Sequence, residues 1–189
     1  ETSTGVVNDV RALADVAHSH GALICVDAVS GLGAVPCEQD EWGLDVVVSG
    51  SQKALMAPPG LGLASVNERA LAYAAEQPAG RYYFDWARTV KGQRKDPPDS
   101  PFTPAVSLIL GLDAALALIE EEGLERVLER HRLLGRATRA AVKALGLELF
   151  GPDDDGANVV TAMRVPEGIE GARVPKLMRD KYGVTIAGG

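Results

Sequence analysis

The chain is poor in the residues on which several kinds of site depend. Of its 189 residues, two are cysteine, three are histidine and 5% are aromatic. Cys25 and Cys37 lack a CxxC spacing, and with so few histidines they disfavour both a disulfide scaffold and a structural zinc site. No other motif requires a metal, so we expect no metal site. Cysteine usage of this kind is typical of a reducing cytoplasm.

Membrane and nucleic-acid partners are disfavoured as well. No run approaches the ~18 apolar residues that a membrane span needs, and no charged and then apolar leader opens the chain. The formal net charge is −7, and lysine and arginine form no basic stripe. Because nucleic-acid affinity depends largely on clustered positive charge, the sequence predicts a soluble protein that binds neither nucleic acid nor a membrane.

Both ends of the sequence have the character of domain interior. The chain has no initiator Met, and residues 1–5 resemble the end of a strand that runs into a loop. Residues 184–186 are a short β-branched strand that stops at Ala187-Gly188-Gly189. We therefore expect an internal piece of a longer protein, without its N-terminal part and its C-terminal end.

The first half of the chain alternates helical and strand patterns. Asn8 can cap a helix that Gly21 would end, and the apolar run 22–26 follows as a strand covered on both faces. Further strands are predicted at 45–48 and 61–66. This alternation indicates an α/β fold with a mainly parallel sheet.

The second half indicates a smaller domain. A long loop with five prolines and an aromatic cluster is predicted over 77–104. Amphipathic helices follow over 106–122 and 124–145. Further predicted elements are strands at 147–150 and 159–165, a helix at 174–181 and the final strand. We place the large domain at residues 1–120 and the small, incomplete one at 121–189.

Asp27 and Lys53 stand out as candidates for chemistry. Each follows a predicted strand, at the edge of a parallel sheet where ligands gather. Alone, Asp27 could form the turn after its strand, and Lys53 could be a solvated lysine. Together they match the needs of a pyridine aldehyde cofactor, namely an amine that forms a Schiff base and a carboxylate that keeps the ring nitrogen protonated. A lysine at that position can also move the proton of the substrate.

Four segments, spread through nearly the whole chain, carry one resemblance: Thr2-Ser3-Thr4-Gly5, Val26-Asp27-Ala28-Val29-Ser30, Ser49-Gly50-Ser51-Gln52-Lys53-Ala54-Leu55 with Ala57-Pro58-Pro59-Gly60, and Thr103-Pro104-Ala105-Val106-Ser107-Leu108. In this order they resemble the class V aminotransferases, which are pyridoxal-phosphate enzymes of fold type I. The resemblance is strongest to the alanine–glyoxylate and serine–glyoxylate (serine–pyruvate) group.

The resemblance implies a role for each matching residue. Lys53 would bind the cofactor and move the proton, and Asp27 would pair with the pyridine nitrogen. Val29 would pack on the ring. Thr2 would hydrogen-bond the cofactor, and Gln52 would lie at the cofactor phosphate. Thr103 would reach the phosphate of the cofactor that is bound to the other subunit. Thr103 could instead be the N-cap of the helix after Pro104.

The resemblance also implies partners and substrates. The enzyme would move an amino group from alanine or serine to glyoxylate or pyruvate, as a homodimer with residues 82–103 near the subunit boundary. Family members carry a phosphate-binding loop upstream of this chain and a carboxylate-binding arginine downstream of it. The chain contains neither.

Alternatives stay open. One is another class V enzyme of the lyase type, and another is a non-catalytic fragment that serves only dimerisation or folding. A cysteine desulfurase is disfavoured, because Gln52 precedes the lysine and no cysteine follows it. We expect Cys25 in the core, and His18, His20 and His131 on the surface of helices without ligand-like partners.

Overall fold

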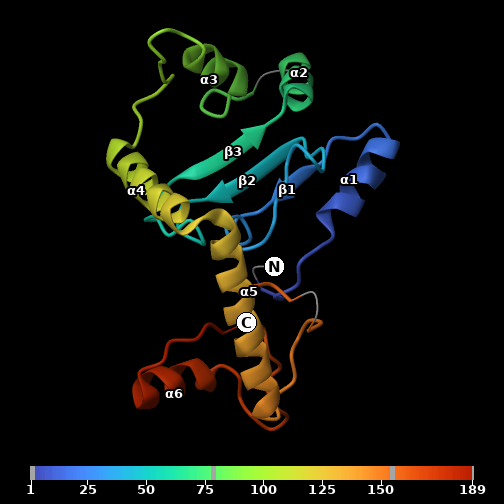
Figure 1. Cartoon of the computed structure of the whole chain (residues 1–189), viewed down its shortest axis with the longest axis vertical. Coiled ribbons are helices and arrows are strands. Elements are labelled where there is room, and N and C mark those ends of the chain that lie inside the picture. Colours follow the sequence, from blue (N-terminus) through green and yellow to red (C-terminus); the bar gives the residue numbers. More distant parts are fainter. Residues whose placement is uncertain (1–2, 78–79, 154–155, 189) are drawn as a thin grey trace. The chain divides into compact units, whose positions relative to one another are not determined.

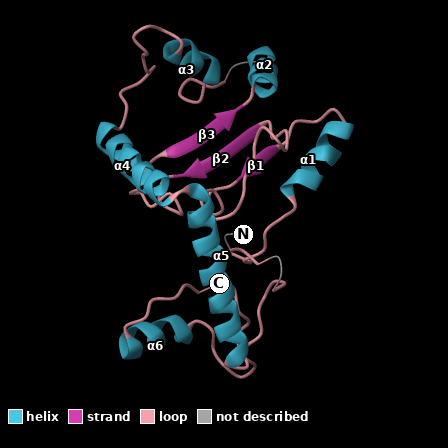
Figure 2. Ribbon diagram, viewed as in Figure 1, coloured by secondary structure: helices cyan, strands magenta, loops and turns pink. Residues whose placement is uncertain are grey.

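The computed structural model describes residues 3–77, 80–153 and 156–188. Its elements follow one another along the chain as shown in Figure 1, and Figure 2 separates helices from strands. The chain divides into two compact units. One is residues 9–127, and the other combines the described residues of 1–8 with those of 128–188. Each unit is described by itself.

A three-stranded sheet forms the centre of the unit 9–127. Its strands β1 (Cys25–Asp27), β2 (Val46–Gly50) and β3 (Gly62–Val66) lie in sequence order. β1 and β2 are parallel, whereas β3 is antiparallel to β2. The three strands occur where the sequence predicts them, although β1 begins later than expected. Cys25 is exposed, so its expected place in the core is wrong, and β1 is not covered on both faces.

Helix α1 (Val10–Ser19) packs against the sheet and lies next to β1 in the view of Figure 2. Its Ala14 is fully buried and packs with Leu44 and Val47. The cap is Asp9, whose carboxylate accepts the Ala12 N–H at 3.0 Å, and not Asn8 as expected. Gly21 has φ +69°, which confirms the expected left-handed residue at the helix end.

A second apolar cluster joins the sheet to the long helices. Leu55, Ile119 and Val127 are its buried members. They come from the loop after β2, from α4 (Val106–Glu122) and from the start of α5 (Leu124–Ala144). The predicted bounds of the first long helix are confirmed, and the second ends one residue before the predicted end. Among the described helices, none combines the length and the apolar character that a membrane span requires.

Two short helices were not foreseen. α2 (Glu68–Glu76) is capped by Asn67, and α3 (Trp86–Gln93) is capped by Asp85 inside the stretch expected to be a loop. Both caps accept a backbone N–H of the first turn, from Ala70 at 2.9 Å and from Arg88 at 3.2 Å. In α3 such a bond stabilises a helix within the segment whose proline and aromatic content predicted a loop.

The other unit consists of most of α5, helix α6 (Arg173–Tyr182) and connecting segments. In its described part, the strands predicted at 147–150 and 159–165 are reduced to one bridge between Leu149 and Met163, and 184–186 is not a strand. Arg139 of α5 is buried and donates to the carbonyl of Ala157 at 3.0 Å. The division between compact units falls inside α5, and the domain boundary at residue 120 stays a prediction.

Candidate cofactor site

The candidate site lies at the edge of the sheet where β1 and β2 both end. Asp27 is the last residue of β1 and is in register with Val48 of β2. The N–H of Ala28 donates to the carbonyl of Val48 at 2.9 Å, which extends the ladder into the next loop. Lys53 follows in the turn after β2. Because the strands are parallel neighbours, the loops with Asp27 and Lys53 leave the same edge.

Asp27 is exposed and partly occupied with its own loop. One carboxylate oxygen accepts the N–H of Val29 at 2.9 Å, the hydrogen bond of an Asx turn. The turn-forming role that the sequence allows is therefore present. The second oxygen has no hydrogen-bond partner among the described residues and can serve a ligand. Val29 is half-buried beside it.

Hydrogen bonds of Ser51 hold the turn that carries Lys53 in place. The Ser51 side chain is fully buried, donates to the carbonyl of Pro58 at 2.6 Å, and accepts the N–H of Leu61 at 3.3 Å. Its backbone carbonyl accepts the N–H of Ala57 at 3.0 Å. These bonds close the loop between β2 and β3. The loop therefore has a defined shape before any ligand binds.

Exposure alternates sharply within this turn. Ala54 and Leu55 are buried, at 6% and 7% exposure, while Gln52 and Lys53 are exposed. In the part of the chain that the structure describes, the Lys53 ammonium has no hydrogen bond or ion pair. The turn thus holds its apolar residues in the protein and leaves the lysine amine exposed.

The loops after β1 and β2 touch each other. Gly33 has φ +89°, and a Cβ placed there would lie 3.4 Å from Leu55 and 3.5 Å from Ala54. Glycine adopts this left-handed backbone without strain, and a side chain there would make ordinary van der Waals contact with the other loop. The two loops also pack through Leu32, which lies against the cluster that contains Leu55. This contact ties the segment after Asp27 to the segment after Lys53.

Gln52 lies back over the end of its own strand. A Cβ at Gly50 would come within 2.8 Å of the Gln52 Oε1, so a side chain at position 50 would displace the glutamine. Gln52 is exposed and lies next to Lys53. Its contact with a cofactor phosphate stays a prediction.

The remaining predicted contacts are less defined. Thr103 is exposed and does not cap a helix, because the N-cap of α4 is Ala105 and no side chain caps it. The N-cap interpretation of Thr103 is therefore wrong, and its phosphate contact stays a prediction. The start of α4 packs on the loop that follows Lys53, since a Cβ at Gly60 would lie 2.7 Å from Leu108. Thr2 lies outside the described residues.

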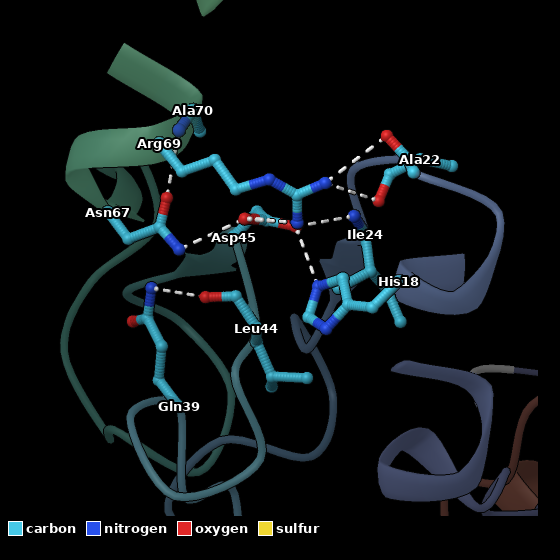
Figure 3. A network of polar contacts seen from close by, with 10 residues as sticks. His18, Ala22, Ile24, Gln39, Leu44, Asp45, Asn67, Arg69 and Ala70 are labelled. Atoms are coloured by element: carbon cyan, nitrogen blue, oxygen red, sulfur yellow. Dashed lines mark hydrogen bonds and ion pairs between the residues drawn. The ribbon is translucent and has the colours of Figure 1, made fainter. Parts of the chain in front are cut away.

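Sequence reasoning missed a buried polar network at the opposite edge of the sheet (Figure 3). Its centre is Asp45, which is 1% exposed and directly precedes β2. His18 is half-buried and contributes its Nε2 at 3.2 Å from an Asp45 oxygen, so the expectation that His18 is a surface residue is wrong. The only sequence signal was a carboxylate at the start of an apolar strand.

The charge of Asp45 is maintained by its neighbours. Burial alone raises the pKa of a carboxyl group. At Asp45 the hydrogen bonds from Ile24, Asn67 and His18, together with the positive charge of Arg69, outweigh burial and lower the pKa below its usual range. Asp45 is therefore a carboxylate that is already satisfied by the protein and is not available to a ligand.

Comparison with known proteins agrees with this arrangement. The family model for aminotransferase class V matches residues 1–189, so the chain belongs to the class V aminotransferase family. Sequence relatives include a serine–glyoxylate aminotransferase of Methylorubrum extorquens, 41% identical over all of this chain and 48% of that protein. A protein of Synechococcus named as the small subunit of a soluble hydrogenase is 44% identical over all of this chain and 49% of its own length.

Among solved structures, an alanine–glyoxylate aminotransferase of Nostoc superimposes with a TM-score of 0.92, at 27% identity, over all of this chain and 50% of that one. The α/β fold expected from the resemblance, that of the pyridoxal-phosphate transferases of fold type I, is thereby confirmed. The chain spans about half the length of the curated relatives that it matches.

Proposed function

We propose that the protein containing this chain is a pyridoxal-phosphate-dependent aminotransferase. It would move an amino group from a small amino acid, alanine or serine, to a 2-oxo acid, glyoxylate or pyruvate. The observation that supports the proposal is the exposed pair of Asp27 and Lys53 on two loops that leave one edge of the sheet and touch each other. The names of the relatives, with glyoxylate as acceptor, agree with it.

The donor set fits this cofactor. An amine without an internal partner suits an aldehyde, and a carboxylate with a vacant oxygen suits a protonated ring nitrogen. When bound, the cofactor supplies an electron sink for the substrate carbanion. Val29 would pack on the ring, and Gln52, Thr2 and Thr103 would hydrogen-bond the cofactor or its phosphate.

Lys53 would do the work of a base as well as that of an anchor. Its Nζ would accept the proton from the substrate Cα and return it to the aldehyde carbon of the cofactor, which requires a movable side chain on a fixed backbone. The buried Ser51 and Leu55 hold the backbone, while Lys53 itself is exposed. Asp27 would hold the proton on the ring nitrogen and keep the ring electron-poor throughout.

The proposed setting is a cytoplasmic homodimer. Tyr82, Tyr83 and Phe84 are 73%, 64% and 75% exposed, and Phe102 and Arg88 pack against this group. Exposed aromatic clusters of this kind are typical of protein contacts. Light scattering of the whole protein at micromolar concentration should give the mass of a dimer, and a monomer would contradict this part.

The central experiment labels Lys53 in the whole protein. Pyridoxal phosphate should give a visible absorbance band, and borohydride should then fix the label on the peptide that contains Lys53. Lys53→Ala should abolish the band, whereas Lys176→Ala, which removes an exposed lysine of α6, should leave it unchanged.

Retention of the band in Lys53→Ala would refute the assignment. Absence of any adduct in the unaltered protein would instead support a non-catalytic role in dimerisation or folding. A screen of amino donors and acceptors in a coupled assay separates an aminotransferase from a class V lyase, because only the transferase requires a 2-oxo acid acceptor for turnover.

A further inference from the structure

Asp45 joins all three strands at the edge of the sheet that lies away from the candidate site. Its Oδ2 accepts the N–H of Ile24, the residue before β1, at 2.9 Å. Its Oδ1 accepts from the side chain of Asn67, the residue after β3, at 3.0 Å, and its own carbonyl accepts the Asn67 N–H at 2.9 Å. One residue at the start of β2 thus holds the start of β1 and the end of β3.

Arg69 extends this connection to the segment before β1 (Figure 3). Its Nη1 lies 3.4 Å and 3.3 Å from the two Asp45 oxygens. Its Nη2 donates to the carbonyls of Gly21 and Ala22 at 3.2 Å and 3.0 Å. Helix α2 therefore holds the connection between α1 and β1 through the same guanidinium that contacts Asp45.

The register of β1 needs stabilising contacts from outside the strand, because β1 is short. It has three residues, in register as Cys25 with Val46 and Asp27 with Val48, and it is largely exposed. A slip of one residue in a strand turns each side chain to the other face of the sheet. Such a slip would turn Asp27 away from the face on which it now lies, so the register of β1 decides where this carboxylate points.

A carboxylate is the group that this position requires. The Ile24 N–H, the Asn67 amide and the Arg69 guanidinium all donate, and the network includes one formal positive charge. An asparagine at position 45 would direct an NH₂ at one of these donors, and a leucine would remove the acceptor that all three share. Buried polar networks of this kind can specify one register among several.

We propose that Asp45 is a positioning residue for the candidate cofactor site: it fixes the register of β1 on β2 and so sets Asp27 beside the Lys53 loop. The assignment of a cofactor to that edge rests on the proposed function. The register itself does not. Asp45 touches neither Asp27 nor Lys53 and acts through the backbone of the two strands.

The test measures β1 directly and then the site. In the whole protein, Asp45→Asn should speed amide hydrogen exchange in the peptide that contains residues 24–30. It should lower kcat about tenfold, with the KM for the amino donor nearly unchanged and the visible cofactor band retained. Glu68→Gln is the matched control, since Glu68 pairs with Arg94 in an exposed contact on the same helix as Arg69. It should change none of these quantities.

A double-mutant cycle separates positioning from general loss of stability. If Asp45 acts through Asp27, then Asp45→Asn should lower kcat little further in the Asp27→Asn protein. An undiminished effect in that background, or unchanged exchange in β1, would overturn the proposal. Should Asp45→Asn fail to fold, Arg69→Met keeps the Ile24 and Asn67 bonds and should show the same pattern at about threefold in kcat.

The two proposals fail in different ways. If the unaltered protein binds no pyridoxal phosphate, the proposed function is wrong, and exchange in β1 still decides whether Asp45 sets the register. If the cofactor binds but exchange in β1 does not respond to Asp45→Asn, the positioning role is wrong and the proposed function stands.

Discussion

Ser51→Ala should loosen the turn that carries Lys53. The substitution removes a fully buried hydroxyl that donates to Pro58 at 2.6 Å and accepts from Leu61 at 3.3 Å. Each neutral hydrogen bond contributes about 1 kcal/mol net, and a backbone group left unpaired adds to the loss. Pro58 is exposed and can turn to water, whereas Leu61 is half-buried. We therefore expect a decrease of about 2 kcal/mol in the free energy of unfolding.

Urea unfolding of the whole protein, followed by circular dichroism, measures this change. Ser19→Ala is the matched control, because Ser19 makes a similar hydroxyl-to-carbonyl bond to Val16 at 2.8 Å in an exposed position. It should cost less than about 0.5 kcal/mol. The rate of borohydride-fixed labelling at Lys53 should fall only in Ser51→Ala. Equal stability losses in the two variants, or unchanged labelling in Ser51→Ala, would show that Ser51 does not hold the loop.

Three further predictions concern the packing and charge around the site. Gly33→Ala should destabilise the protein by about 1–2 kcal/mol, because a φ of +89° is strained for alanine. Gly80→Ala, where the new methyl meets open space, is the control, and an equal cost of the two substitutions in urea unfolding would contradict this. Ile119→Ala should cost about 2–5 kcal/mol, since Ile119 is 8% exposed in the second cluster, and a cost below that of an exposed Leu118→Ala would contradict the assigned core. The lowered pKa of Asp45 means that its stabilising contribution is present above the ordinary carboxyl pKa and is lost as the pH falls through the lowered value, with His18 and Arg69 facing it. Below about pH 4, the free energy of unfolding should therefore fall less steeply with decreasing pH in Asp45→Asn than in the unaltered protein. Equal slopes in the two proteins would refute this.

The local sequence pattern is sufficient to predict the strands and the helix that position the candidate site. The apolar run before Asp27 and the valines before Lys53 predict neighbouring strands, and both residues lie at the predicted edge of the sheet. The helix 106–122 was found because its composition and its limits, a proline before and Gly123 after, leave little alternative. These features depend on residues close together in the sequence.

Features that depend on distant residues were not predictable in the same way. His18 and Asp45 are 27 positions apart, and each alone looks like a solvated polar residue. The strands predicted at 147–150 and 159–165 have strand composition, but only Leu149 and Met163 pair. Strand formation requires a partner at the right register, and composition does not supply one. The same reason explains why β1 is shorter than its apolar run.

The two edges of the sheet carry different kinds of polar residue. At the edge with Asp27 and Lys53 the charged groups are exposed and keep binding capacity unused. At the other edge Asp45 is buried and its acceptors are taken up by Ile24, Asn67 and Arg69. A reactive amine has to stay unpaired to react, so it cannot help to hold its own loop in place. The loop must then be held in place by residues with no role in the chemistry. Ser51 does this next to Lys53, and Asp45 does it at the other end of the same strand.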